Sequence, residues 1–149
     1  MSVRTAREVA EQFIAASTDP AGQALHIYYA PSVVIELPFA PPGFPHRIET
    51  TRDELAARWS QPRSHVFEET LDVAIHETAD PDVVIVEYKL RGTNKQTQDA
   101  FDLPFILVIT VKDGHIVHSR DYSDPIAGAR ALGLLPRLVE ALTNLTTDG

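Results

Sequence analysis

The sequence has no cysteine, and this absence excludes several kinds of site at once. Disulfides, thiolate metal sites, iron–sulfur clusters and cysteine nucleophiles all need that residue. Six histidines remain as candidate metal ligands. His115 and His118 stand three residues apart in a predicted strand, where side chains at that spacing face opposite sides. We therefore predict no metal site, and no cofactor.

Long hydrophobic runs are also missing. The longest apolar stretch, 103–111, spans nine residues and contains Pro104 and Thr110, which is about half the length of a membrane helix. The first residues, MSVRTAREVAEQF, place a charge in every turn and form no apolar signal core. We expect a soluble, cytoplasmic protein with no membrane partner.

Positive charge is scarce, with 13 Lys and Arg against 21 Asp and Glu and a net charge of −8. A phosphate backbone would be repelled by this surface, so no nucleic-acid partner is expected. What the chain does have is a 44% hydrophobic composition over 149 residues, enough for one domain with a core. We predict a single domain over residues 1–149.

Three helices are predicted in the first part of the chain, each from a start signal. The signals are the capping box Thr5-x-x-Glu8, the pair Asp19-Pro20 before a short helix ending near Tyr28, and the capping box Thr51-x-x-Glu54. A C-terminal helical segment follows Asp124-Pro125, with a break near Gly133 and leucines at helical spacing beyond it. Because this apolar stripe must be buried against something, we expect the hinged segment to cap a pocket or its rim.

Five strands are predicted from β-branched and alternating apolar residues, at 33–37, 66–75, 83–90, 101–111 and 115–122. A proline-rich loop is expected after the first strand, up to about Ile48. Consecutive strands after early helices are typical of an α+β fold, with helices on one face of a mostly antiparallel sheet. The strand at 101–111 is apolar on both faces, and we therefore predict a homodimer formed sheet to sheet.

This order of elements resembles the NTF2-like superfamily, and most closely its SnoaL-like branch. The resemblance is carried by the segments 29–38, 84–92 and above all 113–125, DGHIVHSRDYSDP. It implies an NTF2-like cone, in which three N-terminal helices pack on a curved, mostly antiparallel sheet. The same fold serves isomerases, cyclases, hydrolases and non-enzymatic binders, so the resemblance alone does not fix a reaction.

Three activities of similar proteins place different demands on the sequence. Ketosteroid isomerases resemble this chain but use two acidic groups, and the matching positions here are Leu37 and Ile106. Limonene-epoxide hydrolases also resemble the chain and use an Asp-Arg-Asp set. Asp121 matches one aspartate and Glu87 could serve as the second carboxylate, but Ile85 stands at the arginine position. SnoaL-like polyketide cyclases place an acid/base aspartate at the position of Asp121, and this single-aspartate pattern departs least from the sequence.

The candidate catalytic residues are therefore Asp121, as the acid/base, and Glu87, which would assist if the two carboxylates pair across the sheet. Each also has a structural interpretation: Asp121 in an ion pair with an arginine, and Glu87 as an exposed carboxylate beside Lys89. Aromatic side chains are the candidate walls of a ligand pocket: Phe13, Tyr28, Tyr29, Phe39, Trp59 and Phe105.

Two further interpretations remain open beside an acid/base cyclase or isomerase for an apolar cyclic or polyketide-like molecule. One is a non-catalytic binder of a small apolar molecule. The other is a dimerising interaction module whose cone is filled by its own side chains.

Overall fold

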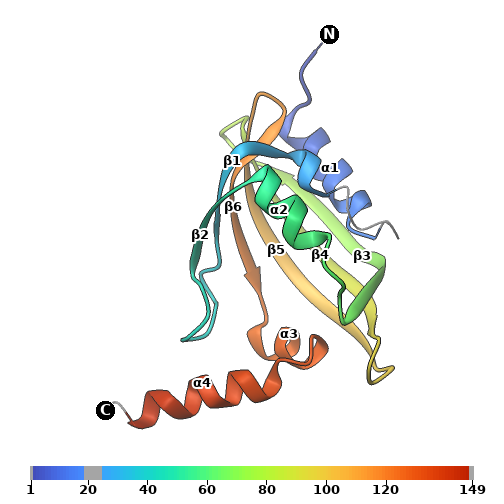
Figure 1. The fold of residues 1–149 in the computed structure, drawn as a ribbon. Helices are drawn as coiled ribbons and strands as arrows, with labels where there is room; N and C mark the ends of the chain where they lie inside the picture. Colours follow the sequence, from blue (N-terminus) through green and yellow to red (C-terminus); the bar gives the residue numbers. More distant parts are fainter. Residues whose placement is uncertain (1, 19–24, 148–149) are drawn as a thin grey trace.

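Six strands form one curved sheet in the computed structural model, which describes residues 2–18 and 25–147 (Figure 1). The strand order across the sheet is β2-β1-β6-β5-β4-β3. β1 and β6 pair in parallel, and all other neighbours are antiparallel. The strands are β1 (Tyr29–Glu36), β2 (Arg47–Thr51), β3 (His65–Glu77), β4 (Val83–Asn94), β5 (Ala100–Lys112) and β6 (His115–Ser123).

The helices are α1 (Ala6–Ala16), α2 (Arg52–Trp59), α3 (Pro125–Ala131) and α4 (Leu135–Thr147), with a 3-10 turn at Leu25–Tyr28. The two predicted capping boxes are present, with Thr5 and Glu8 starting α1 and Thr51 and Glu54 starting α2. Asp124 accepts hydrogen bonds from two backbone N–H groups and caps α3. The sequence predicts these helix starts because a capping residue lies within one turn of the helix that it begins.

The α+β class and the curved, mostly antiparallel sheet are confirmed, but the prediction of three N-terminal helices is wrong. In the described residues, one α-helix precedes the sheet, and the predicted start at Asp19-Pro20 lies outside them. α2 follows two strands, because residues 47–51 pair with Ser32–Glu36 as β2. This five-residue strand was missed since backbone pairing, and not an apolar pattern, defines it.

The core lies between α1 and the concave face of the sheet. Val9 of α1, Val86 of β4 and Ile109 of β5 are fully buried there. Beyond the core, α3 and α4 lie at the end of the sheet opposite the N-terminus (Figure 1). This arrangement leaves room for a pocket between the β1–β2 loop, the end of β6 and the C-terminal helices.

No helix in residues 2–18 and 25–147 has the length and apolar character needed to cross a membrane.

Candidate functional site

Asp121 lies on the concave face of the sheet, and a β-bulge puts it there. Ile116 of β6 is buried on this face opposite Val111. Strict alternation from Ile116 would turn Asp121 to the other face. The register shifts between Thr110 and Val111, so that Ser119 and Asp121 pair with the inward-facing residues 109 and 107. The bulge therefore decides the direction of the carboxyl group.

The environment of Asp121 favours its protonated form. Burial raises the pKa of this carboxyl to about 6, although a hydrogen bond donated by the Ser119 hydroxyl and the charge of His118 act in the opposite direction. Burial, together with the negative charge of Asp121, also raises the pKa of the Tyr29 and Tyr88 phenols. Both phenols stay protonated near neutral pH, whereas Asp121 can gain and lose a proton there.

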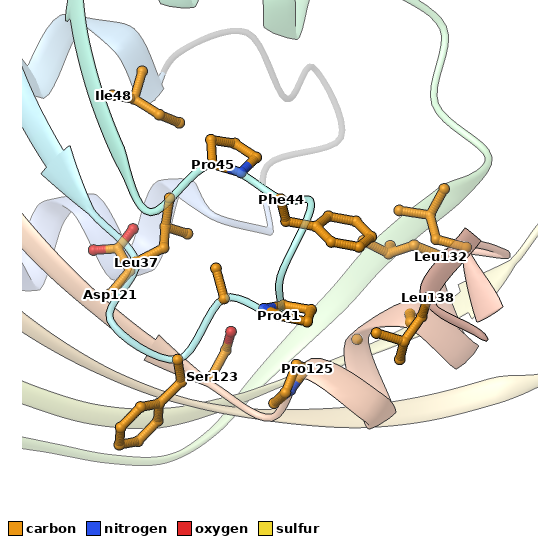
Figure 2. A pocket seen from close by; sticks show the side chains of 15 residues that line it. Leu37, Pro41, Phe44, Pro45, Ile48, Asp121, Ser123, Pro125, Leu132 and Leu138 are labelled. Atoms are coloured by element: carbon orange, nitrogen blue, oxygen red, sulfur yellow. The ribbon is translucent and has the colours of Figure 1, made fainter. Parts of the chain in front are cut away.

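An apolar pocket of about 310 Å³ opens beside Asp121. Figure 2 shows Asp121 toward one side of this pocket, near Leu37, and Leu132 and Leu138 toward the other. Ser123 is the second polar side chain in the lining. The walls come from the β1–β2 loop, the start of β2, the end of β6, α3, and the start of α4. They are Leu37, Phe39, Ala40, Pro41, Phe44, Pro45, Ile48, Pro125, Gly128, Ala129, Leu132, Leu134 and Leu138.

Of the six aromatic residues predicted to bind a ligand, Phe39 lines this pocket. Four of the others pack with one another. Phe13 contacts Tyr28 and Tyr29 edge to face, with ring centroids 6.3 and 5.8 Å apart. Trp59 lies 5.8 Å from Tyr29. These four belong to the aromatic part of the core.

Phe105, the sixth, stacks on Tyr88 at 5.5 Å, one row along the sheet from Asp121. Sequence reasoning did not single out Tyr88, whose burial and closeness to Asp121 depend on strand register. It also missed the pocket walls supplied by the β1–β2 loop, for which the signal was the proline cluster after the first strand. The C-terminal segment, expected to cap a pocket or its rim, supplies walls from α3 and α4.

Glu87 is not brought to Asp121. β5 separates β4 from β6, and Glu87 pairs with Ile106, whose side of the sheet is the convex one. Its carboxylate is exposed and lies 2.7 Å from His76 Nε2. The two carboxylates therefore cannot share a substrate in this structure.

The same bulge turns His115 and His118 toward one face, since they pair with Lys112 and Thr110. The expectation of opposite faces is wrong for this reason. His118 Nε2 lies 2.7 Å from Glu36 Oε2, and His115 Nδ1 contacts the Asp113 carbonyl. No group of three or more metal-ligating side chains occurs among the described residues.

The C-terminal segment breaks where the sequence predicts. Gly133 has a φ of +73° between α3 and α4, a conformation that glycine adopts without strain. Leu138 is 3% exposed and closes one side of the pocket, and Arg137 stacks over the Phe44 ring at 4.6 Å. Leu135, Leu142 and Leu145 of the predicted stripe stay exposed.

Residues 10–119 match the model of the SnoaL-like domain. The chain belongs to the SnoaL-like family. This SnoaL-like protein is also 33% identical over 105 residues to an uncharacterized PhzA/B-like protein of Pseudomonas aeruginosa, covering 70% of this chain and 74% of the relative.

Solved structures with the same fold include a provisionally named isomerase from Bacillus subtilis. It is 27% identical, with a TM-score of 0.76 over 87% of this chain and 93% of the other. A provisionally named polyketide cyclase from Pseudomonas putida is 15% identical, with a TM-score of 0.70 over 87% and 98%. At 15% identity, the second likeness shows the NTF2-like fold alone.

Proposed function

We propose that this SnoaL-like protein is a cofactor-independent acid/base enzyme of the isomerase or cyclase type, for an apolar cyclic or polyketide-like substrate. The observation that carries the proposal is the buried Asp121 carboxyl beside an apolar pocket, with its pKa raised to about 6. An acid/base group works best when its pKa is close to the working pH. The provisional isomerase and cyclase names of similar structures agree with this reaction class.

The proposed step is a proton transfer at a carbon next to a carbonyl group. Ionised Asp121 takes the C–H proton, and the electron pair moves onto the carbonyl oxygen as an enolate. Asp121 then returns the proton to another carbon, which gives the isomer. Alternatively, the enolate carbon attacks a second carbonyl to close a ring, and Asp121 gives its proton to the alkoxide oxygen that this attack forms. The pocket walls exclude water and hold the apolar part of the substrate.

Hydrogen exchange of small ketones in D₂O tests this step without knowledge of the natural substrate. For cyclic enones and 1,3-diketones that enter the pocket, we expect the exchange rate to rise with pH through about 6 and then level off. The reason is that the base is the ionised Asp121, whose pKa is about 6. NMR measures the exchange, and a rate equal to that of buffer for ligands that demonstrably bind would overturn the proposal.

A non-catalytic binder is the second candidate, and one observation favours it. Asp121 is the one carboxylate among the 15 residues that line the pocket, since Glu87 lies on the other face. A mechanism that needs two carboxylates has no second group there. Binding without exchange in the experiment above identifies this function.

We also propose a homodimer formed through the convex face of the sheet. Ile85, Ile106 and Val108 form an apolar patch there, and Ile106 is 41% exposed in the single chain. Light scattering is expected to give the mass of two chains at micromolar concentration. Ile106→Lys should give a folded monomer, because it places a charge in the patch. Val139→Lys, at an exposed apolar position of α4, should leave the dimer intact; a monomeric wild-type protein would contradict the proposal.

A further inference from the structure

Three basic residues gather where β3 begins. Arg63 and His65 are two residues apart at this end of β3, and Lys95 follows the last residue of β4. Backbone pairing joins the two segments, because Lys95 N–H donates to the Ser64 carbonyl at 2.8 Å and His65 pairs with Asn94. The positive charges of Arg63 and Lys95 both act on the His65 ring.

Two polar atoms of this cluster are buried and have no hydrogen-bond partner: Arg63 Nη2 and His65 Nδ1. Across residues 2–18 and 25–147, no acidic side chain forms an ion pair with Arg63, His65 or Lys95. The chain has more acidic than basic residues, so partners are not in short supply. Buried polar groups in folded proteins are nearly always hydrogen-bonded, and leaving one unpaired is costly.

The cluster has the chemistry of an anion site. The guanidinium of Arg63 offers paired donors that match the two oxygens of a carboxylate or phosphate. Burial and the positive charges of Arg63 and Lys95 lower the pKa of His65, so the ring is held neutral in the free protein. An anion bound beside these residues would offset the two positive charges. We propose that Arg63, His65 and Lys95 bind the oxyanion of a small ligand, a carboxylate or a phosphate.

An aromatic wall beside the cluster favours a carboxylate attached to a ring. The His65 ring lies 4.8 Å from the Phe67 ring, and Phe67 meets Phe101 edge to face at 6.0 Å. Ring surfaces of this kind pack on the apolar part of a ligand, while Arg63 holds its charged end.

Arg63, His65 and Lys95 are not among the residues that line the pocket at Asp121. Asp121 aligns with Val86 of β4 through Leu107, whereas His65 aligns with Asn94. Val86 and Asn94 are eight residues apart in β4, so Asp121 and His65 lie about 25 Å apart along the strand direction. The proposal therefore stands or fails independently of the acid/base function.

Thermal unfolding with added anions tests the site. The probes are sodium benzoate and sodium phosphate, each compared with sodium chloride at the same ionic strength. A ligand that binds the folded state raises the melting temperature in a concentration-dependent way. Both probes should therefore raise it more than chloride does, and benzoate should raise it more than phosphate. Loss of the guanidinium in Arg63→Met should weaken benzoate binding at least about tenfold. Arg7→Met, which removes an exposed arginine on α1, should bind as the wild type does.

Without an added anion, Arg63→Met should be as stable as the wild type or more so, because it removes an unpaired buried donor. The imidazole NMR signals of His65 in the wild-type protein provide a readout that needs no variant, and benzoate should shift them. A response to phosphate alone would support the site and assign it to phosphate ligands. The proposal would be overturned if benzoate and phosphate raised the melting temperature no more than chloride and left the His65 signals unchanged. It would also be overturned if Arg63→Met and Arg7→Met weakened benzoate binding equally.

Discussion

Asp121→Asn is expected to lower turnover at least about a hundredfold, since a positioned acid/base group contributes about 10²–10⁴ to a rate. Asparagine has the same size as aspartate and keeps an oxygen that can accept the hydrogen bond from Ser119. It cannot take up a proton at neutral pH, so proton transfer stops while the pocket keeps its shape. Hydrogen exchange of a bound ketone measures the loss, and exchange that survives the change would remove Asp121 from the mechanism.

Ser119→Ala is the companion variant, because it changes the pKa of Asp121 without removing the carboxyl group. The Ser119 hydrogen bond lowers the pKa of Asp121, so its loss should raise that pKa above about 6. The rise of exchange rate with pH should then move to higher pH in this variant. A pH profile identical to that of the wild type would show that another group is the base.

Stability measurements show whether Asp121→Asn keeps its fold, and the difference in unfolding free energy between the variant and the wild type has a predicted sign. The pKa of Asp121 is about 6 in the folded protein and near the usual 3.8 when unfolded. Between these values the folded state binds more protons, so the wild type loses stability as the pH rises from about 4 to about 6. The variant lacks this loss.

Asp121→Asn should therefore match the wild type below pH 4 and exceed it above pH 6, by up to about 3 kcal/mol. Urea unfolding at several pH values measures the difference. A variant less stable than the wild type at pH 7 would show that the ionised carboxylate stabilises the fold, which contradicts a pKa raised by burial.

The parts of the fold that the sequence predicts are those with local causes. The Thr5 and Thr51 capping boxes, the Asp124 cap and the break at Gly133 each depend on residues within one turn. β2 was missed because its single isoleucine, Ile48, gives no strand pattern, and its existence depends on pairing with β1.

The site was harder to predict, because it depends on register. The residue type of Asp121 is visible in the sequence, but its direction is set by a bulge that one extra residue in β6 creates. Glu87 shows the converse: its neighbours Val86 and Tyr88 are buried, yet the carboxylate itself points to the convex face. A count along one strand cannot give either result, because each needs the partner strand.

Truncation after Asp124 is expected to destabilise the protein and expose the pocket. The removed segment includes the buried side chains of Ala129, Ala131 and Leu138, and the carbonyl of Ala131 that accepts a hydrogen bond from Asn94 Nδ2 at 2.9 Å. Asn94 is 4% exposed in the full chain, and the truncation removes the protein partner of its amide. We expect a lower melting temperature, more binding of a hydrophobic dye, and aggregation.

Two point variants in α4 separate the pocket contact from a general effect of the helix. Leu138→Ala removes a buried side chain that lines the pocket and should cost about 2–5 kcal/mol. Leu142→Ala lies one turn further in the same helix, where the leucine is 44% exposed, and should change the stability by about 0.5 kcal/mol or less. Equal effects of the two would mean that α4 does not hold the pocket through Leu138. Burial of Leu138 against the pocket walls must stabilise the protein if that contact exists in solution. A truncated chain that is as soluble and heat-stable as the full chain would therefore show that neither C-terminal helix closes the pocket.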